Sequence, residues 1–353
     1  NGYIDGIDSV GSVRGERRGR VGSNDELTSI SLKQGDNGVE FNFGEITAAS
    51  LFGRVHVDVD GDCVLDEDEE TLAGVTIRLI DGEGRDVART VTDSSGEYAF
   101  ENLLPGEYSI IEEQPVGFFE GGAKAGTAGG DVVDGSQITN IVLASGETAL
   151  NYDFCERPPA EIVGNVFSDR DGDCHFDANE IGINGVRVEL YDAAGNLLAS
   201  TRTDAAGNYR FTNLQAGEYT IREIQPAGWL QGGQRAGSHG GDDSQLDVIT
   251  RIPVGWGQRL TQYNFCELQP SSISGVVFVD GNGDCLRHED EPPIEGVTIE
   301  LRDANGQFVA RTQTDANGQY RFDQLAPGNY QIYEQQPNGY FQGGQIPGTG
   351  DGE

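Results

Sequence analysis

The chain has 353 residues and a formal net charge of −36, with 59 Asp and Glu residues against 23 Lys and Arg residues. So acidic a chain excludes nucleic acid as a partner, because binding to phosphate needs basic side chains. No apolar run approaches the length of a transmembrane helix. The sequence shows no initiator methionine and no signal peptide, so we expect a mature or excised piece of a longer chain.

The sequence repeats itself with a period of 111 residues. Cys63, Cys174 and Cys285 are spaced by this period, and so are Cys155 and Cys266. A period of this length indicates an array of whole domains, because solenoids repeat at roughly 20 to 50 residues.

The copies define four regions in chain order. Residues 1–50 match the C-terminal strands of a unit, which belong either to a preceding unit of the same chain or to a unit completed in another subunit. Complete units span residues 51–157 and 161–268. A third unit spans residues 272–353 and is incomplete at its C-terminus.

Each unit reads as a succession of short strands. In the first unit Val75, Ile77 and Leu79 alternate with polar residues, as in a strand with one buried face. Turns rich in Asp and Gly follow at residues 81–84 and 93–96, where these residues suit the backbone. No segment has a helical period. About seven short strands per unit predict an all-β chain of tandem antiparallel β-sandwich domains.

An acidic loop stands near the start of each unit. Its carboxylates follow the ligand spacing of an EF-hand calcium loop, in which hard oxygen ligands surround one Ca²⁺ and the seventh position supplies a backbone carbonyl. The predicted calcium ligands are Asp58, Asp60, Asp62, Val64, Asp66 and Glu69 in the first unit, Asp169, Asp171, Asp173, His175, Asp177 and Glu180 in the second, and Asp280, Asn282, Asp284, Leu286 and Glu291 in the third.

These loops depart from an EF-hand in two respects. Cysteine occupies the sixth position, where an EF-hand has glycine for a sharp turn, and the flanking segments read as strands rather than helices. The alternative to a calcium site is a solvated acidic turn, although clustered carboxylates repel each other and cost stability without a cation. We expect the third loop to be the weakest, because it has fewer carboxylates and places His288 at the ninth position.

Two disulfide schemes fit the five cysteines. Pairing within units joins Cys63 to Cys155 and Cys174 to Cys266, and pairing between neighbours joins Cys155 to Cys174 and Cys266 to Cys285. Gly44 stands where the later units have cysteine, which favours pairing within units. Disulfides indicate an oxidising, extracellular compartment. Free thiols remain the alternative, and zinc is disfavoured because no Cys or His partner lies at zinc spacing.

The unit resembles the SdrD B-like domains of bacterial cell-surface proteins, which are related to Cna-B-type domains. The matching segments are the acidic loop followed by Gly74–Ile77, the turn at Thr92–Tyr98, Leu104–Tyr108 and Glu113–Phe118. The resemblance implies a prealbumin-like or immunoglobulin-like sandwich, calcium in the acidic loop, and a stalk that spaces other domains from a cell surface. Cna-B relatives often carry a Lys–Asn isopeptide crosslink. We predict none here, because neither Lys33 nor Lys124 recurs in other units.

These features predict a non-enzymatic structural protein, extracellular and cell-surface-bound or secreted, that acts as a stalk, fibre or adhesin shaft stiffened by Ca²⁺ and disulfides. Its expected partners are further domains of the same long chain or identical subunits. The alternatives are an adhesin that binds a host or cell-surface ligand through Phe118, Trp229 and Tyr340, a filament subunit assembled by strand complementation, and an accessory region of a secreted enzyme. The four histidines form no catalytic arrangement with Ser or Cys.

Glu112, Glu223 and Glu334 also recur with the period, each beside the end of a predicted strand. We interpret them as salt-bridge partners or, alternatively, as additional calcium ligands.

Overall fold

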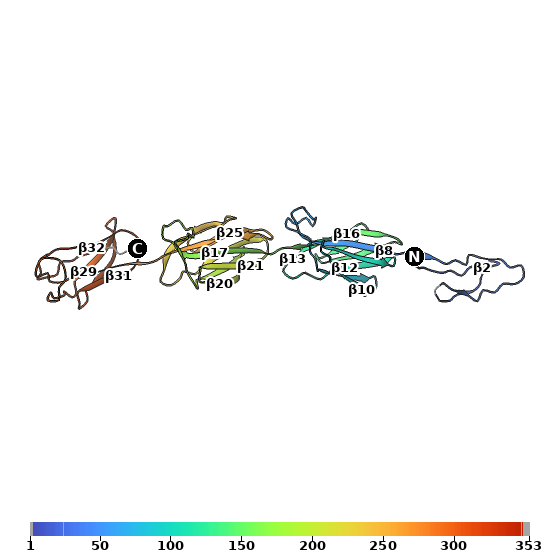
Figure 1. The fold of residues 1–353 in the computed structure, drawn as a ribbon, viewed down its shortest axis with the longest axis horizontal. Coiled ribbons are helices and arrows are strands. Elements are labelled where there is room, and N and C mark those ends of the chain that lie inside the picture. The colour runs from blue at the N-terminus through green and yellow to red at the C-terminus, as the bar shows by residue number, and fades with distance from the viewer. Residues whose placement is uncertain (1–2, 24, 347, 349–353) are drawn as a thin grey trace. The chain divides into compact units, whose positions relative to one another are not determined.

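The computed structural model describes residues 3–23, 25–346 and 348, and every regular element among them is a β-strand (Figure 1). The prediction of an all-β chain is therefore confirmed. No helix long and apolar enough to cross a membrane occurs in these residues. The predicted outer limits of the first and last regions, at residues 1 and 353, lie outside the described residues.

The chain divides into two compact units, which are described separately. One comprises residues 1–160 with the short segments 212–216 and 255–258, and the other comprises residues 161–211, 217–254 and 259–353.

The N-terminal residues form three small sheets, in the orders β1-β7, β3-β2-β6 and β4-β5. The strands are β1 (Tyr3–Asp5), β2 (Ser12–Val13), β3 (Glu16–Arg17), β4 (Arg20–Val21), β5 (Leu27–Thr28), β6 (Gly38–Val39) and β7 (Glu45–Thr47). Val13 is the one buried hydrophobic side chain among the described residues before Ala49. These sheets therefore lack a core of their own.

The first complete domain is a sandwich of a five-stranded sheet, β10-β9-β12-β15-β14, and a four-stranded sheet, β11-β8-β16-β13. Its strands are β8 (Ala49–Val57), β9 (Thr76–Asp81), β10 (Asp86–Val91), β11 (Glu97–Leu103), β12 (Gly106–Glu112), β13 (Phe119–Lys124), β14 (Asp131–Val133), β15 (Gln137–Leu143) and β16 (Thr148–Arg157). Alternating side chains of both sheets, among them Leu51, Ile77, Ile110 and Phe154, form a shared core.

This sandwich differs from the prediction in two ways. It has more strands than expected, because β13 is glycine-rich and β14 is three residues long, so neither has a clear strand pattern. It is also not purely antiparallel, since the last strand, β16, runs parallel to the first, β8. Figure 1 shows these two strands side by side.

A tyrosine hydrogen bond closes one side of the core. The hydroxyl group of Tyr98 donates to the carbonyl oxygen of Tyr152 (2.6 Å). The tyrosine ring lies against Gly53, where an added Cβ would be 1.8 Å from the carbonyl oxygen of Tyr152. Only glycine fits there. The second domain repeats the bond from Tyr209 to Tyr263 at 2.6 Å.

The second complete domain repeats the architecture in the sheets β20-β19-β22-β25-β24 and β18-β17-β27-β23, with β21 and β26 pairing with β17. Its strands are β17 (Ala160–Ser168), β18 (Ile181–Gly182), β19 (Arg187–Asp192), β20 (Leu197–Arg202), β21 (Asn208–Leu214), β22 (Gly217–Glu223), β23 (Leu230–Arg235), β24 (Asp242–Gln245), β25 (Val248–Val254), β26 (Arg259–Leu260) and β27 (Asn264–Leu268). Again the last strand runs parallel to the first.

The third domain contains the strands β28 (Ser271–Val276), β29 (Thr298–Asp303), β30 (Phe308–Gln313), β31 (Gln319–Leu325) and β32 (Tyr330–Glu334). They form two small sheets, β28-β31 and β30-β29-β32, around a core that includes Ile299, Leu301 and Phe322. Among the described residues no strand follows β32.

Candidate calcium loops and their disulfide links

The acidic loop of the first domain begins where β8 ends, and its carboxylates fold back onto the loop backbone. Asp58 is fully buried, and its Oδ1 accepts the N–H of Gly61 (2.7 Å). Glu69 closes the loop, because its two carboxylate oxygens accept the N–H groups of Val59 (2.8 Å) and Asp66 (3.2 Å). The second and third loops repeat all three bonds at the equivalent residues. The side chains are thus held facing the loop interior.

This folding brings predicted calcium ligands together in the first two loops. Oxygens of Asp58, Asp60 and Glu69 lie within 4.8 Å of one another. In the second loop the same holds for Asp169, Asp171 and Glu180, and separately for Asp171, Asp173 and Asp177. Desolvation, followed by the charges of Asp62 and Asp60, raises the pKa of Asp66. The carboxylates therefore repel one another in the protein alone.

The donor set fits Ca²⁺. Calcium binds about six to eight oxygen ligands, mostly carboxylates and carbonyls, in a flexible shell. The Oδ2 atom of Asp58 is buried and accepts no hydrogen bond, and its charge faces the guanidinium of Arg157. The seventh positions, Val64, His175 and Leu286, have exposed side chains, as residues that contribute only a carbonyl would have.

The third loop gathers its side chains differently. Nε2 of His288 lies 2.9 Å from Oδ2 of Asp284, so the histidine pairs with one of the predicted ligands. This contact lowers the pKa of Asp284 and raises the pKa of His288. The loop thus has a histidine paired with Asp284 in place of an acidic ninth position, and its weaker calcium binding stays a prediction.

Cysteine at the sixth position makes the turn that glycine makes in an EF-hand. Cys63, Cys174 and Cys285 have φ values of 53°, 54° and 59°, in the left-handed region that costs energy for a residue with a Cβ. The glycines at the fourth position also have positive φ, with Gly61 at 96°. The loop therefore contains two left-handed residues, of which one is strained.

The structure has the pairing within units. Cys63 is bonded to Cys155 and Cys174 to Cys266, each with Cα atoms 5.5 Å apart and a separation of 92 residues. Each bridge fixes the acidic loop to the last strand of the same domain. Cys285 is a free thiol.

Arg157 is a loop neighbour that sequence reasoning missed. It ends β16, and its Nη2 atom lies 3.6 Å from Oδ2 of Asp58. The second domain has Leu268 at the equivalent position, so its loop has no such counter-charge. An arginine at the end of a long strand gives no sequence signal, because its partner lies 99 residues earlier.

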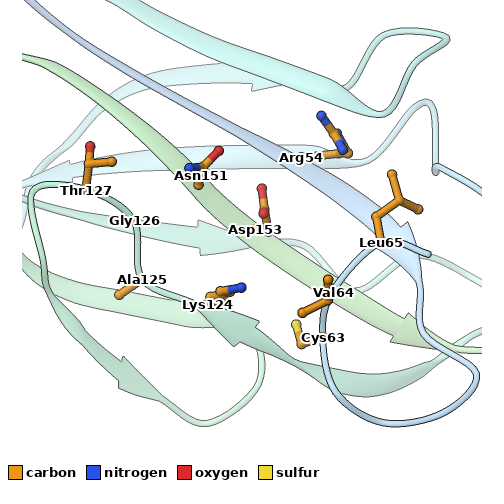
Figure 2. Close-up of a pocket in the computed structure, with 10 residues that line it drawn as sticks. All are labelled: Arg54, Cys63, Val64, Leu65, Lys124, Ala125, Gly126, Thr127, Asn151 and Asp153. Carbon is orange, nitrogen blue, oxygen red and sulfur yellow. The ribbon is translucent and has the colours of Figure 1, made fainter.

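A shallow pocket of about 490 Å³ lies beside the first loop (Figure 2). Figure 2 shows Asp153, on β16, between Arg54 of β8 and Lys124 of β13, with Cys63 and Val64 of the loop at its edge. Its lining contains no histidine, and Cys63 is consumed by its disulfide. The pocket lining has two basic side chains and one acid, but no nucleophile and base in the arrangement that catalysis needs.

Each complete domain also buries a pair of glutamates. Glu112 at the end of β12 meets Glu156 on β16, and Glu223 at the end of β22 meets Glu267 on β27. Burial raises the pKa of all four. Glu112 and Glu223 were singled out from the sequence, whereas Glu156 and Glu267 were missed, although each directly follows a periodic cysteine.

The aromatic residues of the ligand-binding alternative are not equally exposed. Phe118 and Trp229 are half-buried, whereas Tyr340 is exposed.

The fold and the loops define a class of protein: tandem β-sandwich domains, each with an acidic loop, and in the complete domains a disulfide from that loop to the last strand. The family model of the SdrD B-like domain matches residues 49–155, 160–264 and 271–352. The chain therefore belongs to the SdrD B-like domain family, and the predicted resemblance is confirmed. These are extracellular structural domains of bacterial cell-surface proteins, as expected from the disulfides.

Curated relatives agree with this assignment. The chain is 30% identical over 356 residues to serine-aspartate repeat-containing protein F of Staphylococcus epidermidis, covering 99% of this chain and 20% of that protein. It is 32% identical over 289 residues to serine-aspartate repeat-containing protein E of Staphylococcus aureus strain Newman, covering 81% and 24%. The bone sialoprotein-binding protein of S. aureus is 32% identical over 291 residues, covering 82% and 25%. The chain thus spans a fifth to a quarter of these relatives.

A search of solved structures matched, among others, the major pilin subunit BcpA of Bacillus cereus, with a TM-score of 0.40 and 13% identity over 84% of this chain and 90% of that chain. Another is the Bacillus anthracis TIE protein, with a TM-score of 0.39 and 19% identity over 91% and 52%.

Proposed function

We propose that this chain is a load-bearing segment of a cell-surface shaft, in which Ca²⁺ stiffens each acidic loop and a disulfide fixes the loop to the last strand. The segment has no catalytic role of its own. Neighbouring domains of the same long chain are its partners.

The parallel pairing of β8 with β16 is the observation that carries this proposal. In a parallel pair, the start of the first strand and the end of the last strand lie at opposite ends of the pair. Tension applied through the chain termini of the domain therefore shears the interstrand hydrogen bonds from Ser50 to Val57 together. Bonds loaded together resist force better than bonds that open one after another.

The disulfide supports the same role. Cys63 follows β8 and Cys155 lies near the end of β16, so the bridge encloses nearly all of the domain. A domain that yields under tension cannot extend the enclosed 92 residues, which would otherwise add roughly 300 Å of chain. Calcium in the loop between β8 and Cys63 would hold the end of the loaded strand in place.

Single-molecule pulling of the chain tests this function. With calcium and without reductant, we expect the complete domains to resist extension, and any unfolding step to lack the enclosed length. A reductant should add about 300 Å per complete domain. Unfolding at low force with calcium present, at the level of the EDTA sample, would contradict a load-bearing role.

A further inference from the structure

A shallow pocket of the second complete domain gathers three arginines in an otherwise acidic chain. The pocket has a volume of about 520 Å³ and is lined by residues of β17, β20, β21 and β26 and of the turns beside them. Arg202, Arg210 and Arg259 line it with exposed side chains, and Asp204 is the one acid that lines it. The whole chain has 23 basic residues against 59 acidic ones, so three arginines around one pocket form a local positive surface.

The internal repeat shows that the fold does not need these arginines. The first complete domain has Val91, Ala99 and Thr148 at the three equivalent positions, each 111 residues earlier. The same pair of sheets forms there without a basic side chain at any of them. The arginines therefore give the second domain a surface that the first domain lacks.

Two of the three guanidinium groups share one counter-charge. Glu161, on β17, lies 2.5 Å from Nη2 of Arg210 through its Oε2 atom and 2.7 Å from Nε of Arg259 through its Oε1 atom. Arg202 donates an N–H of Nη1 to the carbonyl oxygen of Gly185 (2.6 Å), and no ion pair of the described residues includes Arg202. A neutral carbonyl group leaves the charge of Arg202 unbalanced.

The acid in the lining does not remove this excess of positive charge. Both oxygens of Asp204 are held by its own turn, because Oδ1 accepts the N–H groups of Ala206 and Asn208 and Oδ2 accepts the side-chain amide of Asn208 (3.0 Å). With Asp204 and Glu161 both counted, three guanidinium groups face two carboxylates. Charges are screened over about 8 Å at physiological ionic strength, so this local excess acts on a ligand more than the net charge of the chain does.

The rest of the lining indicates the class of ligand. Val163 is its one aliphatic side chain, and Tyr209 is buried with its hydroxyl group bonded to a backbone carbonyl. The pocket thus lacks the apolar recess in which a peptide anchors a side chain. Amide and hydroxyl groups, which pair with the hydroxyl groups of a sugar, make up the remaining side chains: Asn165, Asn208, Gln262, Thr201 and Thr261.

We propose that this pocket binds an acidic polysaccharide, with the carboxylates of the sugar on the three arginines and its hydroxyl groups on the amide and hydroxyl side chains. Arginine suits a carboxylate because its planar guanidinium group donates two parallel hydrogen bonds to the two oxygens. The binding goes beyond the shaft function and does not depend on calcium in the acidic loops.

Isothermal titration calorimetry of the whole chain with a hyaluronan octasaccharide, which has a carboxylate on every second sugar, tests the proposal. Wild type should bind, and added salt should weaken the binding. The triple variant Arg202→Val, Arg210→Ala and Arg259→Thr should bind about tenfold more weakly or less, because it loses charge-assisted hydrogen bonds. These substitutions install the residues of the first domain. Equal affinity in the triple variant, or no binding by wild type, would overturn the proposal.

Arg251→Asn is the matched control. Arg251 is an exposed arginine of the same domain but lies on β25, in the other sheet, and the first domain has Asn140 at this position. The variant should keep the affinity of wild type. A carboxyl-reduced octasaccharide and a glutamate oligomer of the same charge should both bind more weakly than hyaluronan. Equal binding of the glutamate oligomer would assign the pocket to acidic peptides and contradict a polysaccharide site.

Chemical modification of the unaltered chain keeps the test decisive if the triple variant folds poorly. The reagent p-hydroxyphenylglyoxal modifies exposed arginines, and mass spectrometry measures the extent at each position. The octasaccharide should slow the modification of Arg202, Arg210 and Arg259 and leave that of Arg251 unchanged. Absence of protection at the three arginines, or equal protection of Arg251, would contradict binding at this pocket.

Discussion

The second and third acidic loops have the same backbone, although only the second is joined to a strand by a disulfide. Cys174 and Cys285 have φ values of 54° and 59°, and the aspartate that opens each loop accepts the same backbone N–H groups. The loop conformation is therefore set by carboxylate-to-backbone hydrogen bonds within the loop. The disulfide has a different task, which is to fix an already formed loop to the last strand.

The two loops differ in their charge. The second has an acid at each side-chain ligand position, whereas the third has Asn282 and His288 at two of them. The third loop thus keeps the backbone conformation of the second loop although it has fewer negatively charged side chains. Backbone geometry and charge are thus separate properties of these loops, and the predictions below test that separation in order of decreasing effect.

The largest expected effect is the loss of a disulfide. Replacing Cys174 and Cys266 by serine should destabilise the second domain by about 2–5 kcal/mol, because the unfolded chain regains its freedom. The number of bound calcium ions should stay the same, since the third loop forms without a bridge. Cys285→Ser is the control and should change neither quantity. Loss of calcium binding in the double variant would mean that the bridge shapes the loop.

The second largest effect is expected from replacing the glutamate at the twelfth position of an acidic loop. Glu69→Gln in the first loop should cost about 2 kcal/mol in calcium, because one carboxylate both accepts two backbone N–H groups and faces the cation. Calorimetry of the chain measures the loss, and Glu101→Gln is the control, because the side chain of Glu101 on β11 is exposed. In EDTA the cost should be smaller, since glutamine can still accept one bond. An equal cost in both buffers would argue against a ligand role.

A pH effect should appear in the complete domains, because each of them buries a pair of glutamates. Burial raises the pKa of Glu112 and Glu223 above the usual value, so the folded state prefers their protonated form. In EDTA the stability contributed by these groups is full below their unfolded pKa and is lost as pH rises toward the folded value. Melting temperatures of the complete domains should therefore fall from about pH 5 to about pH 9.

The double variant Glu112→Gln with Glu223→Gln supplies the control for this pH effect. Its melting temperature should depend less on pH, because the substituted side chains do not titrate. An unchanged slope would assign the effect to other acids.

The smallest effect concerns the strained turn. Cys285→Gly should stabilise the third loop by up to about 1 kcal/mol, because glycine adopts a positive φ without a Cβ clash. Cys285→Ala keeps the Cβ and should give no gain. Calcium titration of the two variants measures the difference, with glycine expected to bind slightly more tightly. Equal affinities would show that the left-handed turn carries no strain.

Much of this architecture could be predicted from the sequence, because residues 111 positions apart have the same role in successive domains. The alternation at Val75, Ile77 and Leu79 marks a strand, and the loop spacing marks acids that the structure does bring together. Gly44, in the place of a cysteine, correctly favoured pairing within domains.

Other features depend on contacts that no local pattern encodes. The direction of β16 relative to β8 follows from the path of the chain through the whole sandwich. Glu156 and Glu267 become a chemical centre only because β16 and β27 place them opposite a residue more than forty positions earlier.

Thermal unfolding of the chain in calcium and in EDTA, followed by limited proteolysis, tests the central claim most directly. The account predicts a large fall in melting temperature on chelation, because an ion that binds only the folded state stabilises it. It also predicts new cleavage at the loops that begin at Asp58 and Asp169, with the third loop the least protected by calcium. Identical melting and cleavage in both buffers would contradict calcium-stiffened domains and leave the disulfides as their sole reinforcement.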